Sequence, residues 1–123
     1  LDFSFSGLKT AVANYHREGN KTRLQDVCAS FQQAVVDVLV RKTEWAIRKE
    51  RVGRVTLSGG VAANSALRSA FVRMAQEREV KVFSPSVQLC TDNAAMIAAA
   101  GYHHFMENDT RGEDLNPVAY LPL

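Results

Sequence analysis

The chain has 123 residues, of which 46% are hydrophobic and 23% charged, a composition typical of one globular domain. A formal net charge of only +2 neither requires nor excludes a nucleic-acid partner. No apolar run is long enough to cross a membrane, and the two cysteines, Cys28 and Cys90, lack the spacing of metal ligands, so we expect reduced thiols in a cytoplasmic protein.

The first predicted element is a short strand over residues 3–6, where Phe and Ser alternate before a turn at Gly7. The chain opens at Leu1, directly ahead of this strand, and we therefore expect a piece of a longer protein whose sheet is only partly present. A short helix is predicted over Leu8–Arg17, ending before Gly19.

A long helix from Thr22 to about Glu50 is the clearest prediction. Thr-Arg-Leu-Gln at 22–25 fits a capping box at its start. Apolar residues then recur at the spacing of a buried helical stripe. They are Leu24, Val27, Cys28, Phe31, Ala34, Val35, Val38, Leu39, Trp45 and Ala46. Val36, Val40 and Ile47 widen this stripe, so we expect two faces of the helix to be covered.

Residues 54–64 read RVTLSGGVAAN and predict a strand, a glycine turn and a helix beginning at Val61. Because Gly59 and Gly60 lack Cβ atoms, a ligand can approach the main chain closely. The free N–H groups and the dipole of the following helix favour an anion, and Asn64 adds an amide that can donate and accept. We therefore expect a nucleotide or another phosphate-bearing ligand here.

The alternative for this turn is structural. Two glycines also close tight strand-to-helix connections in many α/β proteins that bind nothing there. The pattern is neither a Walker A motif nor a full G-x-G-x-x-G, so spacing alone leaves both interpretations open.

The second half of the chain continues the alternation of helix and strand. Apolar residues at helical spacing extend the helix to about Met74, and residues 80–83 predict a second strand. An alanine-rich helix is expected from Asn93 to about Met106, followed over 107–123 by a polar loop and an extended tail. The order of elements predicts an α/β layer structure in which helix outweighs strand.

Asp92 has two interpretations. Thr91 or Asp92 is expected to cap the alanine-rich helix, since an aspartate oxygen accepts the N–H groups of a first turn. Alternatively, Asp92 is an anionic ligand for a metal or a metal-bound phosphate. One carboxylate is not a metal site, and His103 and His104 are poor additions because neighbouring helical residues point roughly 100° apart.

Two further groups carry weaker signals. A basic cluster ends the long helix, and Glu44 and Glu50 interleave with it, which indicates a solvated face or, alternatively, a tRNA contact. The cluster is Arg41, Lys42, Arg48, Lys49, Arg51 and Arg54. Ser58 precedes the glycines but does not lie in a G-x-S-x-G elbow, so no Ser-His-Asp arrangement is predicted.

Three stretches together resemble one family. FSFSGLKTAV at 3–12, LSGGVAANSALR at 57–68 and CTDNAAMIAAAG at 90–101 are similar, in order and spacing, to the C-terminal half of TsaD, the tRNA threonylcarbamoyltransferase family formerly described as O-sialoglycoprotein endopeptidase. The similarity covers about Asp2–Gly101. It implies that residues 1–123 form the C-terminal lobe of an actin-like ATPase (ASKHA, RNase H-like) fold, with a nucleotide between this lobe and an N-terminal lobe.

The resemblance also implies a reaction and roles for residues. Members transfer a threonylcarbamoyl group from threonylcarbamoyl-adenylate to N6 of the adenosine 3′ of the anticodon in tRNA. Asn64 falls on a position that binds substrate or nucleotide, whether the adenylate or ATP/ADP, and Gly59 and Gly60 fall near the adenylate. Asp92 falls on a ligand of iron or zinc. TsaB and TsaE are the implied protein partners, and no membrane is implied.

One departure limits what this chain can do alone. The family's other metal ligands are two histidines in an H-x-x-x-H arrangement, and this sequence has no such pair. The metal site and the nucleotide cleft are therefore expected to be incomplete and the segment alone inactive, with no evident general base. Two rival functions stay open: a lobe of a small-molecule kinase of the same superfamily, and a non-catalytic scaffold or dimerisation paralogue.

Overall fold

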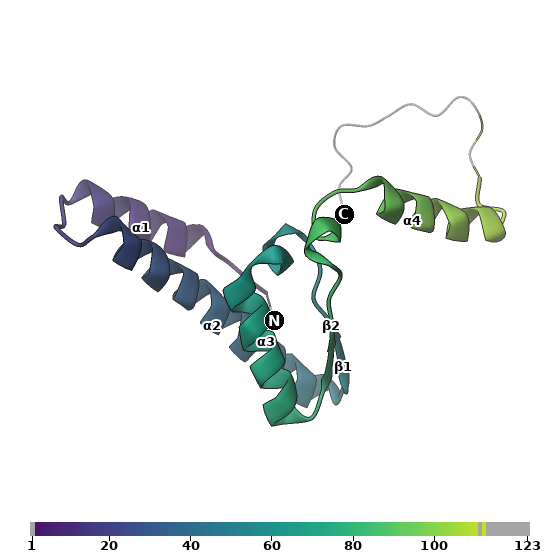
Figure 1. The fold of residues 1–123 in the computed structure, drawn as a ribbon, viewed down its shortest axis with the longest axis horizontal. Coiled ribbons are helices and arrows are strands. Elements are labelled where there is room, and N and C mark those ends of the chain that lie inside the picture. Colours follow the sequence, from purple (N-terminus) through teal and green to yellow (C-terminus); the bar gives the residue numbers. More distant parts are fainter. Residues whose placement is uncertain (1, 111, 113–123) are drawn as a thin grey trace. The chain divides into compact units, whose positions relative to one another are not determined.

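A computed structural model describes residues 2–110 and 112. The contacts divide the chain into two units, Leu1–Cys90 and Thr91–Leu123. The first unit contains three α-helices and a small parallel sheet, and the second contains α4 (Figure 1). Within the described ranges, no helix has both the length and the apolar character needed to span a bilayer.

Helix α1 (Ser6–Arg17) begins two residues earlier than its apolar pattern suggested. The predicted strand over 3–6 is wrong, since residues 2–5 form no strand in the structure. Lys9 donates its backbone N–H to Phe5 O at 3.0 Å, so Phe5 is already the N-cap of α1. The ring of Phe3 stacks on Phe5 and lies under the Lys42 ammonium, 5.1 Å from the ring centroid.

Helix α2 (Leu24–Glu50) ends where the sequence predicted, but its start differs. The predicted capping box is wrong: Arg23 is the N-cap and no side chain caps the helix. Thr22 instead uses its hydroxyl in a hydrogen bond with the Tyr15 hydroxyl, which ties the end of α1 to the start of α2. A tertiary contact has therefore replaced the local cap.

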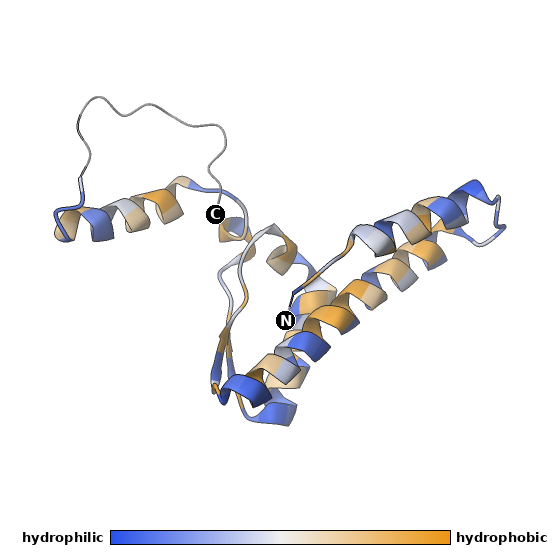
Figure 2. Ribbon diagram, turned by 180° about the vertical axis from the view of Figure 1, so that it is seen from behind, coloured by the Kyte–Doolittle hydropathy of each residue, from blue (hydrophilic) through white to orange (hydrophobic). Residues whose placement is uncertain are grey.

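Both covered faces predicted for α2 are present, because α1 and α3 (Ser65–Arg78) each pack against it (Figure 1). The most buried residues of α2 are Val36 and Ile47, which are 5% and 8% exposed. In the sequence analysis these two residues only widened the predicted apolar stripe; they were not among the residues that define it. Figure 2 shows hydrophobic and hydrophilic residues alternating along this helix, as expected for an element covered on part of its surface.

The core of the first unit forms where α3 packs on α2 and on strands β1 (Arg54–Thr56) and β2 (Lys81–Phe83). The two strands are parallel, with Val55 opposite Val82, and α3 is the crossover that a parallel pair requires. Six residues form the buried cluster: Val36, Ile47, Leu67, Ala70, Phe71 and Met74. Residues from two helices thus form the cluster, and Val55 and Val82 of the strands pack against it, which fixes the position of the strand ends.

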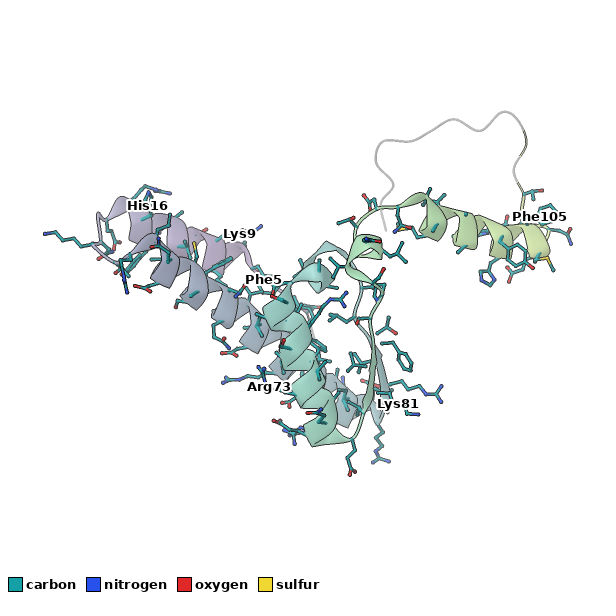
Figure 3. All side chains as sticks on the ribbon, in the orientation of Figure 1. Phe5, Lys9, His16, Arg73, Lys81 and Phe105 are labelled. Atoms are coloured by element: carbon teal, nitrogen blue, oxygen red, sulfur yellow. The ribbon has the colours of Figure 1, made fainter. Side chains whose placement is uncertain are left out.

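The second unit contains α4 (Ala94–Met106), which has no buried residue. Its Ile97 and Phe105 are each 66% exposed, and Figure 3 shows Phe105 near the end of the helix. A helix this apolar is normally covered by other protein. Residues Glu107 and Asn108 form a turn, whereas the extended tail predicted over 117–123 lies outside the described residues.

The buried cluster predicts that substitutions at two neighbouring positions of α3 reduce the free energy of unfolding by very different amounts. Replacing Phe71, which is 3% exposed, by Ala should lower the free energy of unfolding by about 3–5 kcal/mol, because burial is lost and a cavity forms. The neighbouring Val72→Ala change, at a residue 54% exposed, should cost less than about 0.5 kcal/mol. Urea denaturation measures both, and equal losses would contradict this assignment of the core.

Candidate functional site

The glycine turn lies at the carboxyl end of β1. The ladder continues one residue past the strand, where Leu57 donates its N–H to Phe83 O at 2.8 Å. Residues 57–63 therefore leave the sheet at the same edge as residues 84–90, which follow β2. Ligands of open parallel sheets bind at this edge.

Gly59 has a backbone conformation that only glycine adopts readily, with φ 90° and ψ 168°. Gly60 has no positive φ, and it opens a 3₁₀ turn over Gly60–Ala63 in which Ala62 donates its N–H to Gly59 O. A Cβ built on either glycine has no heavy atom within 4 Å among the described residues. The turn is consequently open to the approach of a ligand.

The helix predicted to begin at Val61 begins instead at Ser65, so that part of the prediction is wrong. Asn64 is extended, with φ −65° and ψ 123°, and separates the 3₁₀ turn from α3. It also caps α3, since its Oδ1 accepts the N–H of Leu67 at 3.0 Å. Its Nδ2 donates to Gln32 Oε1 of α2 at 2.9 Å. Both ends of the Asn64 amide are thus used within the first unit.

Asp92 does not cap α4, and neither does Thr91, so the predicted cap is wrong. Asn93 is the N-cap: its Oδ1 accepts the N–H of Met96 at 3.0 Å. Its extended backbone, with φ −151° and ψ 153°, places the helix start one residue later than expected. Asp92 is exposed and makes no hydrogen bond or ion pair within the part of the chain that the structure describes.

The predicted site residues are divided between the two units, with Gly59, Gly60 and Asn64 in the first and Asp92 in the second. Over residues 2–110 and 112, no three His, Cys, Asp or Glu side chains are grouped to hold a metal ion. His104 is paired with a different acid, its Nδ1 lying 2.7 Å from Asp109 Oδ2. The described residues alone therefore do not fit a resident metal, and Asp92 offers one free carboxylate.

The basic cluster at the end of α2 is partly paired. Lys49 lies 3.7 Å from Glu50, and Lys42 donates to the backbone carbonyl of Asp2. The interleaved Glu44 accepts instead from Arg78 of α3, at 3.1 Å. Arg41 and Arg48 are exposed and have no partner in the described ranges. These contacts agree with a solvated face, and a tRNA contact here stays a prediction.

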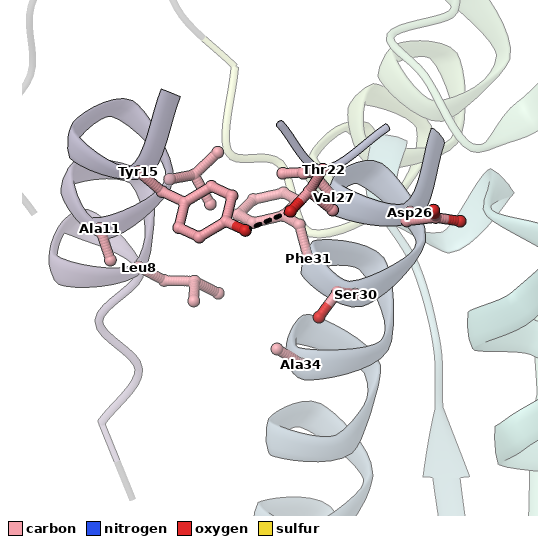
Figure 4. A pocket seen from close by; sticks show the side chains of 10 residues that line it. Leu8, Ala11, Tyr15, Thr22, Asp26, Val27, Ser30, Phe31 and Ala34 are labelled. Atoms are coloured by element: carbon pink, nitrogen blue, oxygen red, sulfur yellow. Dashed lines mark hydrogen bonds between the residues drawn. The ribbon is translucent and has the colours of Figure 1, made fainter. Parts of the chain in front are cut away.

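An apolar slot of about 370 Å³ lies between α1 and α2 and was not predicted from the sequence. Figure 4 shows Leu8, Tyr15 and Phe31 lining it, together with the hydrogen bond between Tyr15 and Thr22. The slot contains none of the predicted site residues. Its lining is mainly apolar; the polar groups in it are the hydroxyls of Tyr15, Thr22 and Ser30 and the carboxylate of Asp26.

Comparison with known proteins gives one consistent result. The model of the family described as "TsaD: tRNA N6-adenosine threonylcarbamoyltransferase" matches residues 1–99. Proteins named tRNA N6-adenosine threonylcarbamoyltransferase are similar along the chain. The protein from Thermodesulfovibrio yellowstonii is 49% identical, and the match covers all of this chain and 39% of the relative's length. The protein from Desulfotalea psychrophila is 54% identical, and the match covers 86% of this chain and 33% of the relative's length.

The backbone of the glycine turn predicts that two adjacent substitutions change the free energy of unfolding by different amounts. Gly59→Ala should destabilise the protein by about 1–3 kcal/mol, because φ 90° strains any residue with a Cβ. Gly60→Ala should change the free energy of unfolding by less than about 0.5 kcal/mol, because its Cβ meets no described atom within 4 Å. Chemical denaturation of the two variants distinguishes them, and a larger loss for Gly60→Ala would contradict the described backbone.

Proposed function

The chain belongs to the TsaD family of tRNA N6-adenosine threonylcarbamoyltransferases, and from this premise we propose that it is part of an enzyme that transfers a threonylcarbamoyl group from threonylcarbamoyl-adenylate to tRNA. The acceptor is N6 of the adenosine 3′ of the anticodon. The chain spans 33–39% of the length of these two relatives, so the activity is that of a longer protein. The segment alone is expected to be inactive.

In this proposal residues 1–123 are the C-terminal lobe of an actin-like ATPase (ASKHA, RNase H-like) fold. The parallel pair with its crossover helix supports it, since such a unit is a building block of a larger α/β sheet. The exposed apolar surface of α4, including Ile97 and Phe105, supports further protein packing on the second unit. The N-terminal lobe of the same protein is the proposed partner for that surface.

The open glycine turn is the observation that carries the proposed function. It lies at the carboxyl edge of a parallel pair, and no described atom approaches the Cβ positions of Gly59 and Gly60. Backbone N–H groups at such a turn bind phosphate well. We assign the adenylate phosphate, or that of ATP or ADP, to this turn. Asn64 can then donate the second N–H of its Nδ2 to the ligand, since only one of the two N–H groups is used by Gln32.

Asp92 is proposed to supply one ligand to iron or zinc. Its exposed carboxylate has no competing protein contact in the described part of the chain, which leaves it available. The remaining ligands would come from the N-terminal lobe of the same protein. The contribution of residues 1–123 is to bind and orient the adenylate while the adenosine amine attacks its carbamoyl carbon. The bond from that carbon to the phosphate oxygen breaks, AMP leaves, and the amine loses a proton. TsaB and TsaE are the proposed protein partners, and the proposed location is the cytoplasm.

Two rival functions make different predictions for the longer protein. A small-molecule kinase of the same superfamily would bind nucleotide at the same turn, would phosphorylate its substrate and would ignore tRNA. A scaffold or dimerisation paralogue would use the exposed face of α4 and would need no carboxylate at Asp92. The family matches favour the transferase over both.

The test uses the full reading frame with threonylcarbamoyl-adenylate, unmodified tRNA and the partner proteins. The nucleoside should gain the threonylcarbamoyl mass. Asp92→Ala should lower the rate on the order of 100-fold or more, because an ion ligand supplies several kcal/mol. Asp109→Ala removes an exposed acid of the same unit and should leave the rate within about twofold.

The other outcomes of this assay distinguish the proposed function from its rivals and from the role of Asp92. Absence of transfer by the intact protein with its partners contradicts the proposed function, and phosphorylation of a small substrate would point to the kinase. Full transfer by Asp92→Ala contradicts only the role of that residue. With the metal removed, thermal unfolding of Asp92→Ala should match the parent, since Asp92 makes no contact that stabilises the described fold. Asp109→Ala should lose only the small contribution of its exposed hydrogen bond with His104.

A further inference from the structure

Arg68 connects three segments of the first unit. It lies in the first half of α3 and is partly buried. Its Nε donates to Ala62 O at 2.6 Å, and its Nη2 donates to Pro85 O at 2.6 Å. Its two terminal nitrogens also donate to side chains, Nη1 to Ser84 Oγ at 3.3 Å and Nη2 to Cys90 Sγ at 3.1 Å.

These acceptors lie on the two loops that leave the sheet at its carboxyl edge. Ala62, which is 1% exposed, belongs to the 3₁₀ turn that Gly60 begins. Ser84, Pro85 and Cys90 belong to the loop after β2. Arg68 therefore joins the loop proposed to hold the adenylate to its neighbour across the sheet edge.

The second loop leads directly to Asp92. Cys90 is 4% exposed, and its thiol also contacts Ser86 O at 3.5 Å, so the end of this loop is anchored within the first unit. Only Thr91 separates Cys90 from Asp92, and one intervening residue limits the Cα separation of its neighbours to roughly 7 Å. Because Cys90 is held in place, the backbone position from which the segment with Asp92 starts is restricted.

The chemistry of the contacts requires arginine. A guanidinium is a planar fork that donates in several fixed directions at once, whereas a lysine ammonium is a compact point charge on a flexible stem. Most N–H groups of Arg68 are directed at protein atoms. This use of its donors indicates a residue that orders the loops and does not itself bind the substrate.

We propose that Arg68 is a positioning residue for the transfer reaction, holding the glycine-turn loop and the loop before Asp92 in one arrangement. This inference rests on the proposed function and goes beyond it. Because misplacement of a bound substrate by about 1 Å can cost 100-fold in rate, loosening both loops should reduce kcat/KM by roughly 10- to 100-fold.

The experiment compares Arg68→Lys with Arg73→Lys in the full-length protein. Arg73 is on the same helix, is exposed and has no hydrogen bond within the described ranges; Figure 3 shows its position on α3. Amide hydrogen exchange without any ligand should become faster in both 57–63 and 84–90 for Arg68→Lys and stay unchanged for Arg73→Lys. Steady-state assays below the melting temperature should show the loss in kcat/KM for Arg68→Lys alone.

The outcomes separate this inference from the proposed function. Unchanged exchange in either loop overturns it, and so does faster exchange with parental kcat and KM, which would mean a purely structural role. If the parent protein transfers nothing, the proposed function fails and the positioning role for that reaction fails with it. If Arg68→Lys does not fold, Ser84→Ala, which removes only one acceptor, should give a smaller change in the same direction, and no change would overturn the inference.

Discussion

The packing of α3 on α2 is the interaction on which the rest of the first unit depends. Each strand has only three residues, and a two-stranded sheet of that length is not stable alone. Leu67, Phe71 and Met74 of α3 form one buried cluster with Val36 and Ile47 of α2, and the strands complete it. Burial of this cluster orders the strand ends, and the loops at their carboxyl edge follow from that order.

Elements with a long periodic pattern were predicted well, while the residues at which the helices begin were not. The end of α2 at Glu50 and the strand, turn and helix order around Gly59 are confirmed. The predicted caps failed because local patterns compete with other partners. Thr22 bonds Tyr15, and extended backbone at Asn64 and Asn93 makes those residues the caps of α3 and α4. Side-chain contacts of this kind depend on tertiary structure.

The candidate site could be predicted only in part, because some of its residues stand out in the sequence and others do not. Adjacent glycines indicate an open turn directly, and the structure shows that turn. Arg68 gave no signal, because two of its four acceptors are backbone carbonyls and three of the four lie 16 to 22 positions away in the sequence. Asp92 was identified by family resemblance, and a metal role for it depends on ligands from other parts of the longer protein. An apolar, exposed α4 is consistent with the same dependence.

The most direct test of the central claim is whether the carboxyl edge of the parallel pair binds the adenylate. Amide hydrogen exchange of the full-length protein should be measured with and without a non-reactive threonylcarbamoyl-adenylate analogue. We expect slower exchange over residues 59–63, where N–H groups of the turn other than that of Ala62, which already donates to Gly59 O, would donate to the phosphate, and no change over α1. Strong binding of the analogue without protection of residues 59–63 would contradict the account.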